Sequence, residues 1–338
     1  MAAARAYILG CAGPVLSPDE AAFFAEAQPW GFILFARNVV EPDQLRALTR
    51  ALREAVGREA PIFIDQEGGR VARLRAPHWR EWLPPLEQVA INKRHGARAM
   101  YLRYRLIADE LRKIGIDGNC APVADIAGAN THPVLKNRCY GEDVVKVAEI
   151  AGAVAQALLD GGVLPVVKHM PGQGRAASDS HVDLPRVKAS YKALRWSDFM
   201  AFEPLCELPI AMSAHVIYEA IDAERPATQS PRVMALIREE LGFEGLMLSD
   251  DLSMGALSGA LAARAQASLA AGCDLVLHCN GVRDEMEALA ASVRPLEGGA
   301  LARAERALAW RRPALPIDID AAEAEFHALM QGRTGADG

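Results

Sequence analysis

The sequence predicts an α/β fold, namely a single (β/α)8 barrel of the TIM type with extra helices at its C-terminal end. Short apolar runs of strand length alternate with longer amphipathic stretches almost from one end of the chain to the other. Strands that are apolar on both faces and separated by helices are typical of parallel sheets. Eight such runs in 338 residues favour a closed barrel over an open doubly wound sheet.

The expected strands are short and apolar. In chain order they cover residues 6–11, 31–35, 61–64, 120–123, 164–167, 208–213, 246–248 and 274–277. The fourth run contains Pro122, which makes it irregular because proline lacks the amide N–H of a sheet ladder. Residues 43–56 have leucines at 45, 48 and 52, the spacing of a helix. The other main helices are expected at 18–27, 97–114, 144–159, 232–241 and 260–271.

One domain is expected over residues 1–338, with the barrel over about 6–295 and terminal helices over about 296–332. The region after Pro295 is rich in Ala, Leu and Arg, which suits helices that pack on the outside of a barrel. The chain shows no fixed-period repeat and no boundary to a second domain.

Composition argues against several classes of protein. The 37 Lys and Arg against 43 Asp and Glu give a net charge of -6 without a dense basic cluster, so nucleic acid is a poor partner. No apolar run reaches membrane-spanning length, and the first residues do not form a signal peptide. The six cysteines are scattered without a C-x-x-C pair, which predicts free thiols and a cytoplasmic location.

Polar side chains recur where the expected strands end. In a barrel of this type the functional groups lie at the C-terminal ends of the strands. In chain order these side chains are Asp65, Arg70 and Arg73; Asp125 and Arg138; Lys168 and His169, then Asp179 and His181; His215; Ser249, Asp250 and Asp251; and His278 and Asn280. The recurrence supports the barrel and indicates a polar, hydroxyl-rich ligand.

Asp250 is the strongest single candidate for a catalytic residue, because it closely follows the apolar run at 246–248. A carboxylate there points into the barrel mouth, where it can attack or stabilise a cationic centre. Asp250 or Asp251 could instead cap a helix near Leu252, and Asp251 is the better candidate for that cap.

The loop after residue 167 carries four ionisable groups. Lys168 and His169 could be a Schiff-base lysine with a helper, donors to sugar hydroxyls, or a structural ion pair. Asp179 and His181 form a D-x-H pair, in which a carboxylate can orient an imidazole and raise its basicity. A solvated loop in which neither group touches anything is the alternative. The glycines at 172 and 174 favour a loop that folds over a site.

The remaining candidate residues could also have a purely structural role. Asp65, with two glycines close behind it, could bind vicinal hydroxyls or cap a turn, and Arg73 and Arg138 would ordinarily form surface ion pairs. No metal is expected, because the chain has no H-x-H, no H-E-x-x-H and no Cys/His cluster with ligand spacing. No cofactor is expected either, since phosphate-binding and dinucleotide motifs are absent.

Three motifs of this chain are familiar together: I-D-Q-E-G-G-R-V at 64–71, K-H-M-P-G at 168–172 with D-S-H at 179–181, and L-S-D-D-L-S-M at 248–254. The set resembles the β-N-acetylhexosaminidases of glycoside hydrolase family 3, and among them the single-domain bacterial enzymes of peptidoglycan recycling. The resemblance covers roughly residues 10–280 in the right order. Two positions depart from it. Gln173 replaces the histidine of a P-G-H-G loop, and Gly255 stands where a bulkier residue is common.

The resemblance implies a retaining glycosidase on a (β/α)8 barrel. Asp250 would be the nucleophile that forms a covalent glycosyl-enzyme, His181 the general acid/base, and Asp179 the group that orients it. A His–Asp dyad would thus replace one of the two carboxyl groups that retaining glycosidases usually employ. The residues implied to bind N-acetylglucosamine are Asp65, Arg73, Arg138, Lys168 and His169.

The function expected from this resemblance is that of a cytoplasmic exo-β-N-acetylglucosaminidase. It would release terminal β-linked N-acetylglucosamine from 1,6-anhydro-N-acetylmuramic acid fragments of the cell wall and from their peptides. A small-molecule carbohydrate substrate would be its partner, and neither nucleic acid nor a membrane is expected. A Lys168 Schiff-base aldolase or lyase and a non-catalytic sugar-binding barrel are the alternatives. We expect the Gly-hinged loop to be displaced without ligand and to bring His181 to the glycosidic oxygen when sugar binds.

Overall fold

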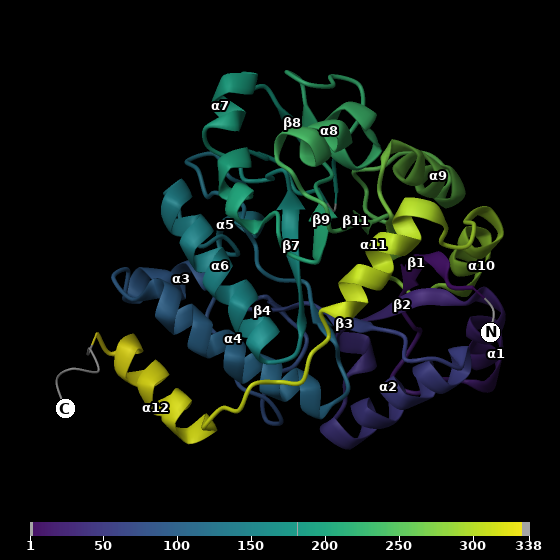
Figure 1. Cartoon of the computed structure of the whole chain (residues 1–338), viewed down its shortest axis with the longest axis horizontal. Helices are drawn as coiled ribbons and strands as arrows, with labels where there is room; N and C mark the ends of the chain where they lie inside the picture. Colours follow the sequence, from purple (N-terminus) through teal and green to yellow (C-terminus); the bar gives the residue numbers. More distant parts are fainter. Residues whose placement is uncertain (1–2, 181, 333–338) are drawn as a thin grey trace.

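Eight parallel strands close into a barrel with helices around it in a computed structural model of the chain, which describes residues 3–180 and 182–332 (Figure 1). The strands are β1 (Arg5–Leu9), β2 (Pro29–Leu34), β3 (Ile62–Ile64), β6 (Gly118–Asn119), β7 (Leu164–Met170), β9 (Ile210–Ser213), β11 (Leu246–Asp251) and β12 (Leu275–His278). Around the barrel they follow the order β1-β12-β11-β9-β7-β6-β3-β2. The predicted (β/α)8 barrel is confirmed.

The fourth strand of the barrel lies earlier than predicted. β6 pairs through Gly118 and Asn119 with β3 on one side and β7 on the other. A Cβ atom on Gly118 would lie 2.2 Å from the ring of Phe63, so only glycine lets that ring pack here. Residues 120–123 run beyond the strand, and Val123 alone bridges to Lys168. The prediction of 120–123 was wrong because a two-residue Gly-Asn strand has no apolar run to mark it.

The main helices cover the outside of the barrel near their predicted positions. They are α1 (Pro18–Ala27), α2 (Pro42–Val56), α4 (Gly96–Lys113), α6 (Val144–Asp160), α9 (Leu261–Ala271) and α10 (Arg283–Ser292). In α2 the predicted stripe of Leu45, Leu48 and Leu52 is buried, and the helix ends at Gly57 in the left-handed conformation. None of the described helices is long and apolar enough to cross a membrane.

Shorter helical turns fill the connections. They are η1 (Ala36–Asn38), α3 (Pro85–Ile91), α5 (Pro133–Lys136), α7 (Tyr191–Arg195), η2 (Phe199–Ala201), η3 (Glu203–Leu205) and η4 (Ala227–Gln229). The single helix predicted at 232–241 is divided, because α8 (Pro231–Ala235) continues as the wider π-helical turn η5 (Leu236–Glu240). Apolar spacing cannot distinguish the two helix types over so short a run.

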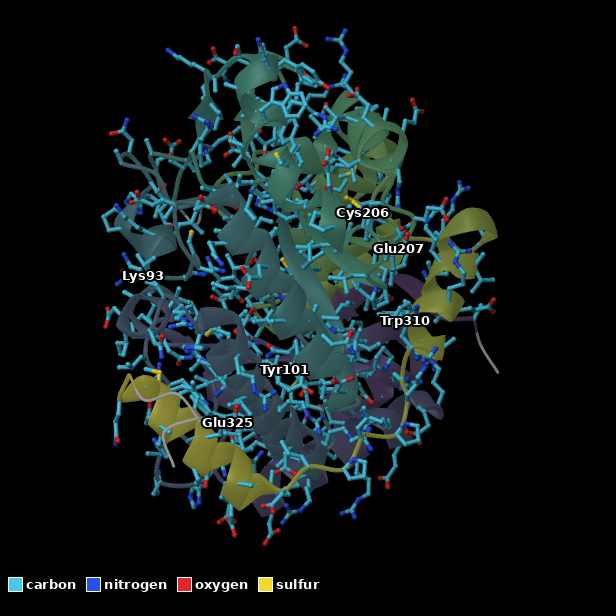
Figure 2. The ribbon with its side chains drawn as sticks, turned by 60° about the vertical axis from the view of Figure 1, so that its left-hand side comes forward. Lys93, Tyr101, Cys206, Glu207, Trp310 and Glu325 are labelled. Carbon is cyan, nitrogen blue, oxygen red and sulfur yellow. The ribbon has the colours of Figure 1, made fainter. Side chains whose placement is uncertain are left out.

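Two C-terminal helices, α11 (Gly298–Ala309) and α12 (Ile319–Met330), lie on the outside of the barrel (Figure 1). α12 packs along α4, where Arg98 pairs with Glu325 at 2.7 Å. Figure 2 shows Glu325 near Tyr101 of α4, and Trp310, just after α11, near Cys206 and Glu207. Both helices therefore cover surface far from the carboxyl ends of the strands, where the site lies.

Candidate active site

A cavity of about 190 Å³ opens where the barrel strands end. Its walls include Asp250 and all five residues predicted to bind sugar: Asp65, Arg73, Arg138, Lys168 and His169. Apolar side chains, among them Phe35, Met212, Met254 and Leu277, complete the lining. Asp250 and the five residues predicted to bind sugar therefore converge on one place.

A short hairpin brings Arg73 back to Asp65. Its strands are β4 (Gln66–Gly68) and β5 (Val71–Ala72), which pair antiparallel. The buried Gln66 side chain accepts hydrogen bonds from the backbone N–H groups of Arg73 at 2.8 Å and Leu74 at 3.0 Å. This closes the hairpin, so the Arg73 guanidinium donates to Asp65 Oδ2 at 2.9 Å. Arg73, for which a surface ion pair was the alternative, therefore pairs with Asp65 in the cavity wall.

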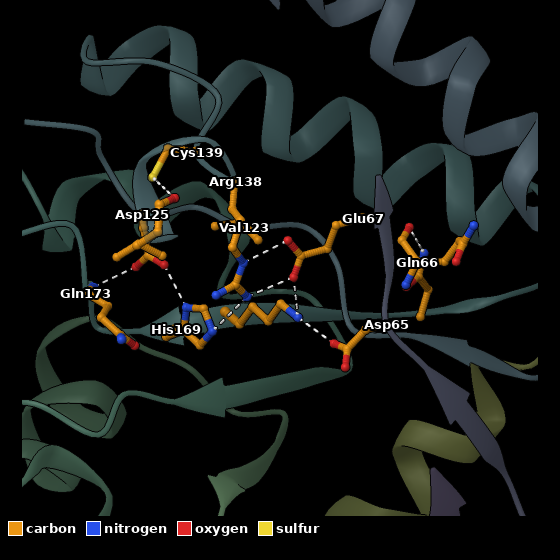
Figure 3. Close-up of polar contacts among 12 residues, drawn as sticks. Asp65, Gln66, Glu67, Val123, Asp125, Arg138, Cys139, His169 and Gln173 are labelled. Atoms are coloured by element: carbon orange, nitrogen blue, oxygen red, sulfur yellow. Dashed lines mark hydrogen bonds and ion pairs between the residues drawn. The ribbon is translucent and has the colours of Figure 1, made fainter. Parts of the chain in front are cut away.

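Glu67 is the centre of the charged network, although no feature of the sequence had indicated a role for it. Its side chain is fully buried. Arg138 donates to both of its carboxylate oxygens, at 2.8 and 2.9 Å, and Lys168 Nζ lies 2.7 Å from Oε1. Lys168 also donates to Asp65 Oδ1 at 2.8 Å (Figure 3). Because Arg138 is 71 residues away in the chain, no local spacing could have revealed the pair.

The ion pairs decide the charge of each member of this network. Burial alone would raise the pKa of Glu67, but Arg138 and Lys168 lower it from its ordinary 4.5 to about 2. Burial likewise opposes ionisation of Asp65, and Lys168 and Arg73 hold its pKa well below the usual range. Burial would lower the pKa of Lys168, whereas Asp65 and Glu67 raise it above the ordinary value. All three groups are therefore charged at neutral pH.

His169 connects this network to a buried carboxylate. Its Nδ1 lies 2.7 Å from Asp125 Oδ2, and its Nε2 lies 3.4 Å from Nη2 of Arg138 (Figure 3). A guanidinium can only donate, so Nε2 of His169 accepts this hydrogen bond. Nδ1 therefore carries the ring proton and donates a hydrogen bond to Asp125. Asp125 follows the fourth strand, as the sequence indicated, but its role as the partner of His169 comes from the structure.

Asp250 is the penultimate residue of β11, which extends three residues beyond the predicted run and ends at Asp251. Burial would raise the pKa of the Asp250 carboxyl, but the nearby His215 and His169, the backbone N–H of Asp251 and the Lys168 ammonium lower it below its ordinary value of 3.8. The Asp251 N–H donates to Asp250 Oδ1 at 2.8 Å. Asp250 is therefore an anion on the cavity wall at neutral pH.

Asp251 does not cap a helix. The first helix after it is α9, ten residues later in the chain, so the helix expected near Leu252 was wrong. Its carboxylate instead accepts from the backbone of Ser253 at 3.1 Å and of Cys279 at 3.2 Å. These bonds connect the turn after β11 to the end of β12. They therefore restrict the backbone next to Asp250.

His215 is a further buried neighbour of Asp250, and its place at a strand end had not indicated a specific role. It follows β9, and its Nε2 lies 3.1 Å from the carbonyl oxygen of Asp251. A carbonyl only accepts, so this nitrogen carries a proton. Burial lowers the pKa of His215.

Among the described residues no group of three or more His, Cys, Asp or Glu side chains could hold a metal ion.

The predicted dyad loop is described only in part. His181 lies outside the described residues, so its pairing with Asp179 and its distance from Asp250 stay predictions. The carbonyl oxygen of Asp179 accepts from the backbone of Val182 and Asp183, both at 3.0 Å, which forms a turn. Ser180, between the two dyad residues, lines the cavity.

Comparison with known proteins places this site in a family. Residues 16–309 match the model described as the glycosyl hydrolase family 3 N terminal domain, a span that contains the whole cavity lining. A beta-hexosaminidase of Alkalilimnicola ehrlichii is 40% identical over 81% of this chain and 80% of its own length. A beta-hexosaminidase of Pseudomonas aeruginosa is 37% identical over 85% of this chain and 86% of its own.

Solved structures agree with this assignment. Native NagZ from Neisseria gonorrhoeae superposes with a TM-score of 0.84 at 28% sequence identity, covering 97% of this chain and 96% of that one. The same protein in complex with N-trifluoroacetyl-D-glucosamine gives a TM-score of 0.83 at 29% identity, with 97% of both chains covered. With a matching family model over most of its length and these relatives, the chain belongs to glycoside hydrolase family 3 and is a hydrolase.

Proposed function

We propose that this chain is a retaining exo-β-N-acetylglucosaminidase. The observation that carries the proposal is Asp250, a carboxylate held ionised on the wall of a small polar cavity at the barrel mouth. Relatives named beta-hexosaminidase support the reaction class. A structural neighbour solved with N-trifluoroacetyl-D-glucosamine supports the sugar.

In the proposed mechanism Asp250 attacks the anomeric carbon and forms a covalent glycosyl-enzyme, which water then hydrolyses with net retention. His181 protonates the leaving oxygen and later deprotonates the water, and Asp179 orients its ring. An imidazole has an ordinary pKa of about 6.5, so it can exchange protons near neutral pH without the strong perturbation that a carboxylic acid needs.

The charged network is proposed to bind the sugar hydroxyls. Asp65 offers acceptor capacity, while Lys168 and Arg73, already neutralised by their partners, offer donors that need no new counter-ion. Phe35 and Met254 supply apolar surface for the ring and the acetamido methyl group. The volume of about 190 Å³ falls below the roughly 300–1,000 Å³ of pockets for drug-sized ligands, which suits one sugar unit and exo action.

The natural substrates proposed are cell-wall fragments in which N-acetylglucosamine is linked to 1,6-anhydro-N-acetylmuramic acid, with or without a stem peptide. The resemblance to the single-domain enzymes of peptidoglycan recycling supports this choice, and so does the likeness to NagZ over nearly the full length of both chains. Turnover of such fragments would place the enzyme in the cytoplasm.

The Schiff-base alternative loses its support at Lys168. A Schiff-base lysine must reach its neutral amine form, which a lowered pKa provides. Here two carboxylates lie within 2.8 Å of Nζ and raise its pKa. The proton is therefore held most firmly where the lyase mechanism would have to remove it.

Hydrolysis of an aryl β-N-acetylglucosaminide tests the proposal. We expect the wild type to release the aryl group, Asp250→Ala to abolish release, and a 2-fluoro sugar analogue to become attached to Asp250. Asp284→Ala, at an exposed aspartate of α10, is the matched control and should keep the wild-type rate. Labelling of another carboxylate would refute the assignment of the nucleophile.

Substrate choice is tested separately. Rates for aryl glycosides with and without the 2-acetamido group would show whether the sugar is N-acetylglucosamine. Release of N-acetylglucosamine from the 1,6-anhydro disaccharide, followed by mass spectrometry, would test the cell-wall substrate. Preference for a glucoside lacking the acetamido group would contradict the proposal.

A further inference from the structure

A buried hydrogen bond joins two residues of the loop after β7. The side-chain amide of Gln173 donates from Nε2 to Oγ of Ser180 at 2.9 Å. Gln173 is 5% exposed and Ser180 is 4% exposed, so water competes little for either group. Figure 3 shows Gln173 next to Asp125, on the opposite side of that carboxylate from His169.

Gln173 is itself held by Asp125, the buried partner of His169, which lines the sugar cavity. Its backbone N–H donates to Asp125 Oδ1 at 2.6 Å, while the other oxygen of Asp125 faces His169 at 2.7 Å. Its carbonyl oxygen accepts from the backbone of Ala176 at 2.9 Å. The backbone and side chain of Gln173 therefore extend the network of Arg138, His169 and Asp125 into the loop.

Ser180 is held from a second direction. Its carbonyl oxygen accepts from the backbone of Ala256 at 3.2 Å, in the segment that follows β11 and its Asp250. Ser180 is thus fixed through its side chain to the β7 loop and through its backbone to the β11 loop. Because it is the residue between Asp179 and His181, fixing Ser180 restricts the backbone from which both dyad side chains project.

We infer that Gln173 is a positioning residue for the Asp179–His181 pair, acting through its hydrogen bond to Ser180. The inference rests on the proposed function, in which His181 is the general acid/base. Proton transfer depends steeply on the placement of the acid, because the acid must lie within hydrogen-bond reach of the glycosidic oxygen. The buried bond from Gln173 to Ser180, the residue next to His181, provides that placement, and Gln173 itself is not among the residues that line the cavity.

Leaving-group dependence separates this role from simple packing. An aryl glycoside with a dinitrophenyl group departs as a stable anion without protonation, whereas one with a methoxyphenyl group needs the acid. For both, kcat/KM reports events up to the formation of the glycosyl-enzyme. A variant with a misplaced acid should therefore lose rate on the methoxyphenyl substrate alone.

The variant to measure is Gln173→Met, which keeps the length of the side chain and removes its amide. General acid catalysis contributes about 10²–10⁴-fold, so we expect at least a tenfold loss of kcat/KM on the methoxyphenyl substrate. The dinitrophenyl substrate should stay within about twofold of wild type. The basic limb of the pH profile should flatten on the methoxyphenyl substrate, because it reports the acid. Gln156→Met, at an exposed glutamine of α6, is the matched control.

Ser180→Ala removes the acceptor and provides a second test should Gln173→Met fail to fold. It should reproduce the same selective loss. The double variant should be no worse than either single one, because both remove one interaction. Equal losses on both substrates, or additive losses in the double variant, would overturn the inference. A wild type that hydrolyses no aryl β-N-acetylglucosaminide would instead overturn the proposed function.

Discussion

Replacing Glu67 by glutamine should destabilise the protein strongly, although the two side chains have the same shape. Glu67 is fully buried and neutralises Lys168, which is almost fully buried, and Arg138, which is mostly buried. After Glu67→Gln, Lys168 keeps Asp65, but Arg138 loses the carboxylate that accepts two of its hydrogen bonds. Removing one partner of a buried ion pair typically costs about 3–5 kcal/mol, because the other charge is left uncompensated.

The pKa of Glu67 gives an independent magnitude. Lowering it from 4.5 to about 2 corresponds to roughly 3 kcal/mol of stability, since each pKa unit is worth 1.36 kcal/mol. The folded pKa is depressed, so this stability is fully present above pH 4.5 and is lost as the pH falls toward 2. The free energy of unfolding of wild type and Glu67→Gln should therefore differ most near neutral pH and converge in acid.

Urea unfolding followed by tryptophan fluorescence measures both effects. Glu149→Gln, in an exposed pair with Lys146 on α6, is the matched control and should change the free energy of unfolding by less than about 1 kcal/mol. A loss below about 1 kcal/mol for Glu67→Gln, or a difference from wild type that does not change between pH 6 and pH 3, would refute the reasoning about this network.

Two further predictions concern Asp250, the proposed nucleophile, and the opposite end of the barrel. The surroundings of Asp250 hold its pKa below 3.8, so kcat/KM for the dinitrophenyl substrate should fall only as the pH drops below that value. A loss of kcat/KM that already begins above pH 4.5, while the protein is still folded, would contradict this prediction. Asp274→Asn should lower the free energy of unfolding in urea by about 1–3 kcal/mol, because the buried carboxylate accepts from Arg303 at 2.6 Å and from Arg238 at 2.9 Å. The same variant should leave kcat/KM unchanged. A large loss of kcat/KM with an unchanged free energy of unfolding would contradict this purely structural role of Asp274.

Much of the barrel was predictable because its signals are local. Most strands of the barrel are buried and contain an apolar run, and helices such as α2 show their stripe of leucines directly. The errors fall where the local signal is absent. β6 contains only Gly118 and Asn119, and the turn after Asp251 is closed by backbone and side-chain bonds that have no periodicity.

The sequence by itself determined the barrel, the cavity at the ends of its strands, and Asp65, Lys168, His169 and Asp250 as members of its lining, because the ends of parallel strands meet at one face. Only the tertiary structure decided which charges neutralise each other. Glu67, in the connection after β3, meets Arg138 in the connection after β6 and Lys168 in β7, and Gln173, in the loop after β7, meets Asp125 in the connection after β6. Such pairings depend on where the folded chain places segments remote in sequence, and burial of both charges makes those pairings strong.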